Sequence, residues 1–278
     1  CIRDRPNNGG YHDGSIDIQI NVTYWTQDLQ QVDAPGEGTT TVMSARVKLT
    51  DVSQFRTGFA NKYPSKQARH VNDMTKRFNA VMGIDGDYCL YHEQGIVVRN
   101  GQTLRMRPHK GRDELIVDEN GDFHLITCTT QAKWDEYIAG GGTVLHAFCF
   151  GPALVVDGVP LTSLDDVTID NGKAKKAQRM VIGQIGKLEY LILTNEGPES
   201  TAPKSVGFDL VQMANLCVQF GLDNAYNLDG GSSSTIALNN QKINSPSSHK
   251  NRMVGDCIWF ATLVKEETWR ETQGTENQ

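Results

Sequence analysis

The alternation of hydrophobic and polar residues predicts a chain built mainly from short strands. Over residues 15–25 every second residue is apolar, which is the period of a half-buried strand. Its apolar members are Ile16, Ile18, Ile20, Val22 and Tyr24. Asn-Gly pairs at Asn100 and Asn120 favour tight hairpin turns between further strands. The other strand-like segments are 41–49, 80–84, several pieces within 94–126, 144–150, 153–156, 179–185, 188–193, 225–228, 234–238 and 258–263.

Three segments have the helical period instead. Residues 65–78 carry apolar side chains at the spacing of one helix face, and residues 130–139 end at a run of glycines. A third helix follows the capping-box pair Asp209 and Gln212, and Gly221 ends it. Phe208 and Met213 are placed for a hydrophobic staple around that cap. Its expected buried stripe is Leu210, Met213, Ala214, Cys217 and Val218.

Many strands with two or three helices indicate an α+β fold. We expect a mixed or antiparallel, strand-rich single domain with the helices packed on the sheet, because no linker-like segment or internal repeat divides the chain. Residues 1–60 are predicted to be a strand-rich N-terminal extension of the same fold, residues 61–264 the main domain, and residues 265–278 a polar tail.

Composition and charge exclude several classes of protein. The 278 residues have a formal net charge of -6, so the basic surface of a nucleic-acid-binding protein is not expected. No segment approaches the ~20-residue apolar run of a membrane-spanning helix. The seven histidines show no metal-ligand spacing, although His92 and His146 lie near motifs discussed below.

The six cysteines are too few for a disulfide-built scaffold and contain no C-x-x-C pair. Cys89, Cys149, Cys217 and Cys257 lie in apolar stretches and are predicted to be buried free thiols. Cys1 has two interpretations: the lipid-anchored first residue of a mature bacterial lipoprotein, or an arbitrary start of the sequence.

The segment from Asn227 to Thr235, Asn-Leu-Asp-Gly-Gly-Ser-Ser-Ser-Thr, is the strongest candidate for chemistry. Its two glycines permit close backbone approach, and its N–H groups could form an anion-binding nest. Asp229 follows a strand end, where a carboxylate can serve catalysis or binding. By itself, however, the pattern also fits an ordinary hairpin.

This segment resembles the Asn-Leu-Asp-Gly-Gly-Gly-Ser-Ser-Thr motif of the phosphodiester glycosidase family. Further motifs follow in the family's order over roughly residues 65–264. They are Ile84-Asp-Gly-Asp-Tyr-Cys89, Phe150-Gly-Pro-Ala-Leu-Val-Val-Asp-Gly158, Arg179-Met-Val-Ile-Gly183, the capped helix from Asp209, Asn244-Ser-Pro-Ser-Ser248 and Arg252-Met-Val254. Several motifs in order are more specific than any one of them.

The chain departs from the family pattern at four places. Asp85 stands where the family usually has Asn, Cys89 replaces an aromatic residue, and Ser232 replaces the third glycine. The segment Thr194-Asn-Glu-Gly197 stands where many members have Val-Asp-Gly-Arg, which moves the strand-end carboxylate to Glu196.

The resemblance implies a hydrolase that cleaves a sugar-1-phosphodiester bond in an envelope or extracellular glycan. Because a phosphate monoester is already a good leaving group, such a site needs cations and N–H donors around the phosphate more than a strong acid. A carboxylate would then stabilise the anomeric carbon, activate water or attack directly. The predicted catalytic residues are Asp229, Asp87, Arg179 and Glu196. The predicted substrate-binding residues are Asp85, Gly86, Gly230, Gly231, Ser232, Ser233 and Arg252.

Other interpretations remain open from the sequence. The departures are also typical of a carbohydrate- or phosphate-binding module that has lost catalysis. A serine nucleophile within 232–234 would need a partner histidine, and the Gly-x-Ser-x-Gly elbow is missing. No cofactor or metal is required by the pattern, while Asp85 and Asp87 around Gly86 would also suit an ordinary turn or a weak Ca²⁺ site.

Overall fold

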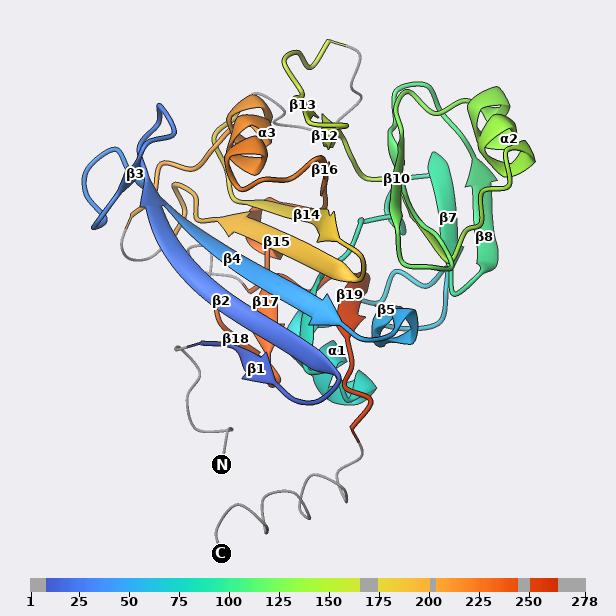
Figure 1. The fold of residues 1–278 in the computed structure, drawn as a ribbon, viewed down its shortest axis with the longest axis horizontal. Helices are drawn as coiled ribbons and strands as arrows, with labels where there is room; N and C mark the ends of the chain where they lie inside the picture. Colours follow the sequence, from blue (N-terminus) through green and yellow to red (C-terminus); the bar gives the residue numbers. More distant parts are fainter. Residues whose placement is uncertain (1–8, 166–174, 201–203, 245–250, 265–278) are drawn as a thin grey trace, which may run out of the picture.

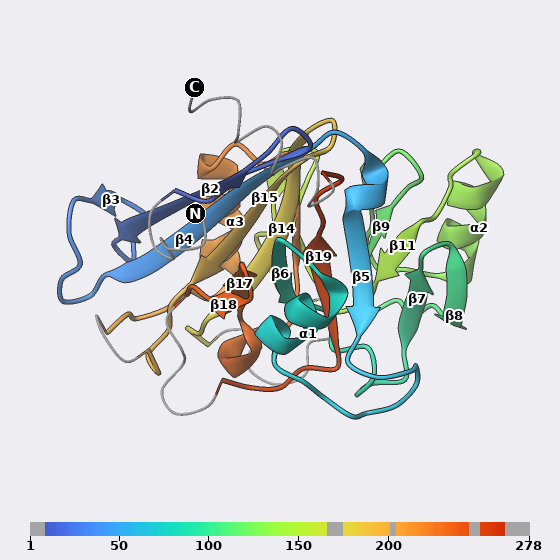
Figure 2. The same cartoon turned by 90° about the horizontal axis from the view of Figure 1, so that it is seen from below.

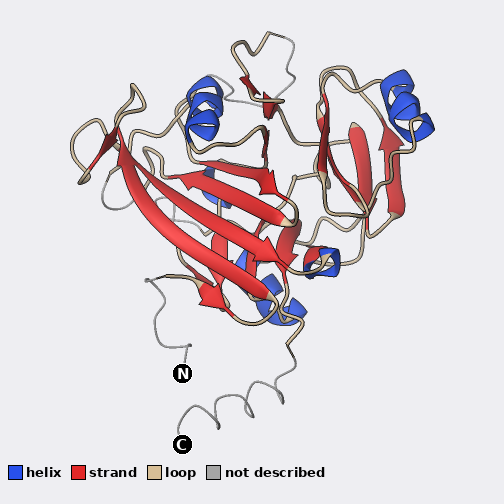
Figure 3. Ribbon diagram, in the orientation of Figure 1, coloured by secondary structure: helices blue, strands red, loops and turns tan. Residues whose placement is uncertain are grey.

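Three antiparallel sheets surround a common core, and each sheet carries one α-helix on its outer face (Figures 1 and 3). The computed structural model describes residues 9–165, 175–200, 204–244 and 251–264. This arrangement confirms the predicted α+β class. None of the helices among these residues has the length and apolarity that crossing a membrane requires.

The largest sheet has nine strands in the order β1-β2-β4-β15-β14-β16-β12-β13, with β3 paired to β2. Its strands β2 and β4 come from the first 60 residues and pair directly with β15, so this segment and the motif-bearing strands share one sheet. The strands are β1 (Tyr11–His12), β2 (Ile16–Trp25), β3 (Gln31–Val32), β4 (Thr40–Leu49), β12 (Ala153–Val156), β13 (Val159–Pro160), β14 (Arg179–Gly186), β15 (Glu189–Asn195) and β16 (Asn224–Asn227).

The two smaller sheets have five strands each, in the orders β18-β17-β6-β19-β5 and β10-β9-β11-β7-β8. The first contains β5 (Phe55–Phe59), β6 (Met82–Asp85), β17 (Ile236–Leu238), β18 (Gln241–Lys242) and β19 (Asp256–Phe260). The second contains β7 (Gly95–Arg99), β8 (Gln102–Arg107), β9 (Glu114–Val117), β10 (Phe123–Ile126) and β11 (His146–Phe148).

The helices cover the outer faces of the sheets. Helix α3 (Leu210–Gln219) packs on the nine-stranded sheet, α1 (Val71–Phe78) on the sheet containing β6, and α2 (Gln131–Ala139) on the sheet containing β7. Figure 2 shows α1 beside β6 and β17, and α2 at the far end of the molecule beside β7 and β8. As predicted, Asp209 and Gln212 form the capping box of α3.

The central strands are buried on both faces, which explains their continuous apolar runs. In β14, Met180 and Ile182 enter the common core, whereas Val181 between them packs under α3. Opposite faces of one strand therefore serve two cores. The free thiols Cys89, Cys149, Cys217 and Cys257 are buried, as predicted.

Three details of the sequence interpretation were wrong. Helix α1 begins at Val71 rather than near residue 65, because Arg69 exchanges backbone hydrogen bonds of 3.0 and 2.8 Å with Val254 and is therefore extended. Val218 is 39% exposed, and Leu216 takes its place in the buried face of α3. Val22 is 42% exposed. The buried residues of β2 are Ile16, Ile18 and Trp25, so burial of every second residue does not continue along the whole strand.

Candidate active site

The site forms where two strands from different sheets end side by side. Strand β6 ends at Asp85, and β16 ends two residues before Asp229. The backbone N–H of Asp229 donates to the Gly86 carbonyl at 3.1 Å, which joins the two strand ends directly. Residues 144 positions apart in sequence thus lie next to one another, and both aspartates are buried.

The surroundings of Asp229 set both its pKa and the orientation of its carboxyl group. Burial raises the pKa of Asp229 to about 6, while the Gly230 N–H, the Ser233 side chain and the Arg252 charge partly oppose this rise. The Gly230 N–H donates to Asp229 Oδ1 at 2.9 Å, so the carboxyl orientation is fixed by its own loop. At neutral pH this group is mostly ionised and able to accept a proton.

The loop after Asp229 is a short 3₁₀ turn over Gly231–Ser233. Gly231 has a φ of +63° and donates its N–H to the Gln178 carbonyl at 2.9 Å. The Gly230 N–H is held by Asp229 and the Ser233 N–H by the Gly230 carbonyl. These three N–H groups therefore set the shape of the loop in this structure, instead of forming the open anion nest that the sequence suggested.

Gly86 packs so closely against the Asp256 carboxyl group that no side-chain atom fits between them. A Cβ at this position would come within 2.3 Å of Asp256 Oδ2. The Gly86 N–H also donates to the Asp256 carbonyl at 3.1 Å, so the backbone cannot easily move away.

We therefore expect Gly86→Ala to destabilise the protein by about 1–3 kcal/mol through overpacking, and to displace Asp85 and Asp87. Urea denaturation measures the stability. Gly36→Ala is the matched control, because Gly36 is exposed and its added Cβ would meet nothing within 4 Å. Equal stability of the two variants would contradict the close contact at Gly86.

Asp87 is part of a buried ion network that includes two residues the sequence analysis missed. Arg99 Nη2 lies 3.1 Å from Asp87 Oδ1 and 3.2 Å from Asp256 Oδ2. The Cys149 N–H donates to Asp87 Oδ2 at 2.9 Å, and the Cys89 N–H donates to Oδ1 at 3.1 Å. Asp87 is thus held rigidly behind the strand end.

The two carboxylates of this network have different protonation behaviour. The Arg99 guanidinium and the backbone donors hold the pKa of Asp87 well below its usual range, despite burial. Burial and the neighbouring Asp87 raise the pKa of Asp256 to about 7. Arg99 and Asp256 carried no motif in the sequence; their only signals were a charge at the end of an apolar strand and an aspartate shortly after Arg252.

Arg252 and two tyrosines border the site on its exposed side. The guanidinium of Arg252 lies 5.5 Å from the Tyr88 ring centre, and its backbone N–H contacts the Ser232 carbonyl at 3.4 Å. Tyr88 stacks on Tyr91 with 4.5 Å between ring centres. Arg252 is exposed and lowers the pKa of Asp229, so it is a cation beside the carboxylate that a ligand from solvent can reach.

Arg179 and Glu196, the other two predicted catalytic residues, have different surroundings from Asp229 and Asp87. Arg179 Nη2 donates to the Lys175 carbonyl at 2.6 Å and Nε to the Phe208 carbonyl at 3.4 Å, and burial lowers its pKa to about 10. Glu196 is buried and, with Asp85, raises the pKa of Lys242, which burial lowers. Glu196 thus lies near the site through Lys242, a third residue that the sequence analysis missed.

The two histidines near the motifs are enclosed by other groups. His146 is buried, receives the Asn100 N–H on Nδ1 at 3.2 Å, and has its pKa lowered to about 3 by burial. His92 Nδ1 contacts the Gln94 carbonyl at 2.9 Å, and burial lowers its pKa.

The groups around Asp87 indicate whether a metal ion would fit there. Ligand atoms of Asp87, Cys89 and Asp256 lie within 4.8 Å of one another. However, Arg99 already supplies a positive charge to both carboxylates, and a buried thiol is a poor ligand for Ca²⁺. Asp85 turns instead to the Thr235 N–H at 2.8 Å. A weak Ca²⁺ site was one of two interpretations of Asp85 and Asp87 in the sequence; the residues around them do not favour it, and we derive no step through a metal.

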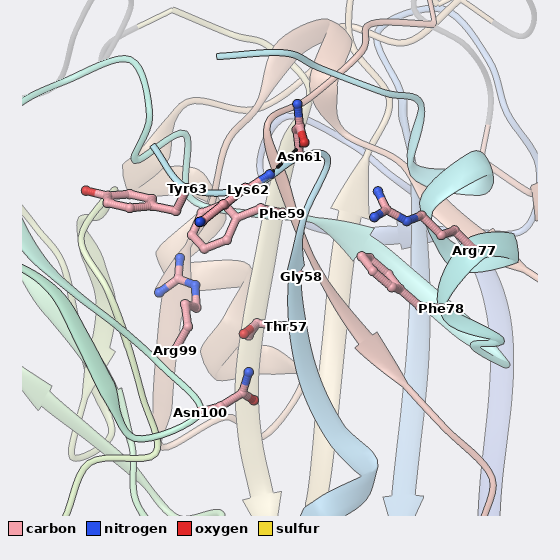
Figure 4. A pocket seen from close by; sticks show the side chains of 10 residues that line it. All are labelled: Thr57, Gly58, Phe59, Asn61, Lys62, Tyr63, Arg77, Phe78, Arg99 and Asn100. Carbon is pink, nitrogen blue, oxygen red and sulfur yellow. Dashed lines mark hydrogen bonds between the residues drawn. The ribbon is translucent and has the colours of Figure 1, made fainter. Parts of the chain in front are cut away.

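Arg99 also lines a hollow of about 390 Å³ (Figure 4). Thr57, Phe59 and Tyr63 line it together with Arg99, and its rim includes the cations Lys62 and Arg77. A second hollow, of about 470 Å³, lies beside α2 and is lined by Asp118, Tyr137 and Gly141 among others. Neither of these two hollows includes Asp85, Asp229 or Arg252.

The family model for phosphodiester glycosidase matches residues 78–261, which contain both strand ends and Arg252. The chain belongs to the phosphodiester glycosidase family. Of the residues quoted for the Asn244–Ser248 motif, 245–248 lie outside the described residues, as do Cys1 and the tail 265–278. The described Asn244 receives the Ile236 N–H at 2.8 Å and thereby supports β17 beside the site.

Three solved structures have a similar fold. The catalytic domain of zebrafish N-acetylglucosamine-1-phosphodiester alpha-N-acetylglucosaminidase, auto-inhibited by its pro-peptide, is similar with a TM-score of 0.68 and 14% identity, over 91% of this chain and 86% of that one. A hypothetical protein from Synechocystis gives 0.57 and 13%, over 88% and 62%. A Burkholderia pseudomallei protein assigned as exported gives 0.54 and 15%, over 82% and 75%. No curated protein matches the sequence significantly.

Proposed function

We propose that this protein hydrolyses a sugar-1-phosphodiester bond in a glycan of the cell envelope or extracellular space. The observation that carries the proposal is the meeting of Asp229, Asp87 and Arg252 at the ends of β16 and β6, within the region that matches the family. A buried carboxylate beside an accessible cation suits a substrate that develops positive charge at carbon and carries negative charge on phosphate.

In this proposal, each residue of the site has a different role. Asp229, ionised above a pH of about 6, would activate water or stabilise the anomeric carbon. Arg252 would hold the phosphate, whose departure needs little protonation. Tyr88 and Tyr91 provide an aromatic surface next to Arg252 for the sugar or the group beyond the phosphate. Asp87, fixed by Arg99, keeps a permanent negative charge behind the site.

The direct test is release of free sugar from synthetic sugar-1-phosphodiesters by the purified protein. Hydrolysis in ¹⁸O-labelled water then identifies the bond, since label in the sugar means C–O cleavage and label in the phosphate means P–O cleavage. Glycan binding without turnover across a panel of sugars would instead favour the second candidate, a binding module of the same fold. One observation favours that module: the loop N–H groups of Gly230 and Gly231 are already bonded within the chain.

The site of cleavage is proposed to lie outside the cytoplasm. The support is the described Burkholderia pseudomallei neighbour, which is assigned as exported, and the family's association with glycan substrates. Fractionation of the producing cell, followed by detection of the chain, tests this, and a cytoplasmic pool alone would contradict it.

Arg252→Ala is expected to lower kcat/KM by about ten- to hundredfold, mainly through KM, because a charged hydrogen-bond donor to the phosphate is lost. Arg252→Lys should retain part of the activity, as Lys keeps the charge but not the fork geometry. Arg107→Ala is the control, since Arg107 is an exposed arginine on β8 that pairs with Glu93. Unchanged kinetics for Arg252→Ala would remove Arg252 from the phosphate site.

A further inference from the structure

Asp85 is a buried carboxyl group with few stabilising contacts. Its side chain is fully buried at the end of β6. One oxygen, Oδ1, accepts the Thr235 N–H at 2.8 Å, whereas Oδ2 is buried and has no hydrogen-bond partner among the described residues. An ionised carboxylate in this position would carry an unpaired buried charge, which is strongly unfavourable.

The titratable groups that face Asp85 come from three elements. Asp229 approaches from the loop after β16, Lys242 from β18, and Cys257 from the paired position on β19. Burial is the main cause that raises the pKa of Asp85 well above its usual range, Asp229 adds to the rise, and Lys242 opposes it. The Lys242 ammonium is directed to Asn251 Oδ1 at 3.3 Å, and burial lowers its own pKa.

Asp229 differs from Asp85 because it has more groups that stabilise its ionised form. Asp229 Oδ1 accepts the Gly230 N–H, and Arg252 and Ser233 also favour the carboxylate. Within the ranges that the structure describes, Asp85 accepts the Thr235 N–H on one oxygen, and its other oxygen has no hydrogen-bond partner. When two carboxyl groups are neighbours, the one whose ionised form has fewer stabilising contacts is the one that stays protonated.

We propose that Asp85 and Asp229 form an unequal pair in which Asp85 keeps its proton and Asp229 is the carboxylate. The catalytic meaning of this pair rests on the proposed function, but the unequal protonation does not. A protonated Asp85 presents one acceptor and one donor, as an Asn side chain does. The chain therefore keeps the chemistry of the family's Asn at this position with a different residue.

In the reaction, Asp85 is a positioning residue that acts through Asp229. For cleavage at the C–O bond, water attacks the anomeric carbon, its oxygen forms the new C–O bond and its proton passes to Asp229. The bond from carbon to the phosphate oxygen breaks, and its electron pair leaves with the phosphate. The Asp85 proton stays in place throughout. Loss of that proton would put a second negative charge beside Asp229 and raise the pKa of Asp229.

The kinetic test uses Asp85→Asn, which fixes the side chain in its uncharged form. We expect kcat/KM on a synthetic sugar-1-phosphodiester to stay within about tenfold of the wild type. The rise of kcat/KM through a pH of about 6 should remain, because it belongs to Asp229. Any alkaline fall that arises from ionisation of Asp85 should disappear. A loss of more than about a hundredfold in a folded Asp85→Asn protein would overturn the proposal, since Asp85 would then act as a carboxylate.

A second measurement needs no substrate and so separates this proposal from the proposed function. Infrared difference spectra at neutral pH should show a protonated-carboxyl band in the wild type that is absent in Asp85→Asn and still present in Asp229→Asn. Glu114→Gln is the matched control, because Glu114 is also buried, with one oxygen accepting the Ile96 N–H at 2.8 Å and the other without a hydrogen-bond partner in the described part of the chain. It should remove a different band.

The two measurements have distinct failures. If the wild type hydrolyses no sugar phosphodiester but shows the Asp85 band, the pair stands and the proposed function fails. If activity is found and the Asp85 band is missing at neutral pH, the pair is refuted and the proposed function stands.

Discussion

Replacement of Asp229 by Asn is expected to lower kcat/KM on a sugar-1-phosphodiester by roughly 10²–10⁴-fold, the range typical of a lost general base. The Asn side chain can still accept the Gly230 N–H through its oxygen, so the loop should keep its shape. What disappears is the charge that would take a proton from water or stabilise the anomeric carbon. Steady-state kinetics on the intact protein measure the effect.

The pH dependence gives this prediction its sign. Because the pKa of Asp229 is raised to about 6, the wild-type kcat/KM should rise as the pH increases through that value and the carboxylate forms. Asp229→Asn should show a low rate with no such rise. Asp157→Asn is the control, because Asp157 is exposed in a turn with a φ of +50°, which Asn tolerates well. Wild-type kinetics in Asp229→Asn would remove Asp229 from the chemistry.

Arg99→Met should cause the largest loss of stability among these variants, about 3–5 kcal/mol, because it leaves two buried carboxyl groups without their cation. Arg99 lies within 3.2 Å of both Asp87 and Asp256 and is itself 5% exposed. Its guanidinium also lies 4.4 Å from the Phe148 ring centre and donates to the Ala147 carbonyl. The midpoint of urea unfolding at constant m-value measures the loss.

The loss should depend on pH with a definite sign. In the folded protein Arg99 holds the pKa of Asp87 below its unfolded value, and this contribution is present above the unfolded pKa and lost as the pH falls through the folded pKa. The stability difference between Arg99→Met and the wild type should therefore shrink in acid.

Two controls isolate the buried network. Arg46→Met removes an arginine that pairs with Glu189 at the surface and should cost no more than about 1 kcal/mol. Adding Asp87→Asn to Arg99→Met should recover part of the loss, since the ionised carboxylate that has lost its cation is removed. If Arg46→Met and Arg99→Met were equally stable, the ion network would not hold the site together.

The sequence predicted the local features that depend on near neighbours. The capping box of α3, the hairpin turn with positive φ at Asn100 and Gly101, and long strands such as β2, β4, β14 and β15 follow from residue type and period. The start of α1 could not be predicted in this way, because the pairing of Arg69 with Val254 decides it across 185 positions of sequence. The exposure of Val218 likewise depends on which side of α3 meets the sheet.

The residues of the candidate site also fall into two groups, those that the sequence predicted and those that only the structure revealed. Asp85, Asp87 and Asp229 were found because they occupy strand-end motifs with glycines. Arg99, Asp256 and Lys242 have no such neighbours in sequence, and only the packing of three sheets brings them to the carboxylates. Arg179 had a motif, yet the contacts of its side chain with the carbonyls of Lys175 and Phe208 could not be foreseen from it.

The sequence by itself determined the α+β class, the family and the aspartates on which the chemistry is proposed to depend, because motif and period are properties of neighbouring residues. The tertiary structure alone decided their charge states. Whether Asp87 is ionised, Asp85 protonated and Asp229 poised near a pH of 6 depends on burial and on donors from distant segments. Desolvation and Coulomb interaction act through space, and no pattern along the chain records them.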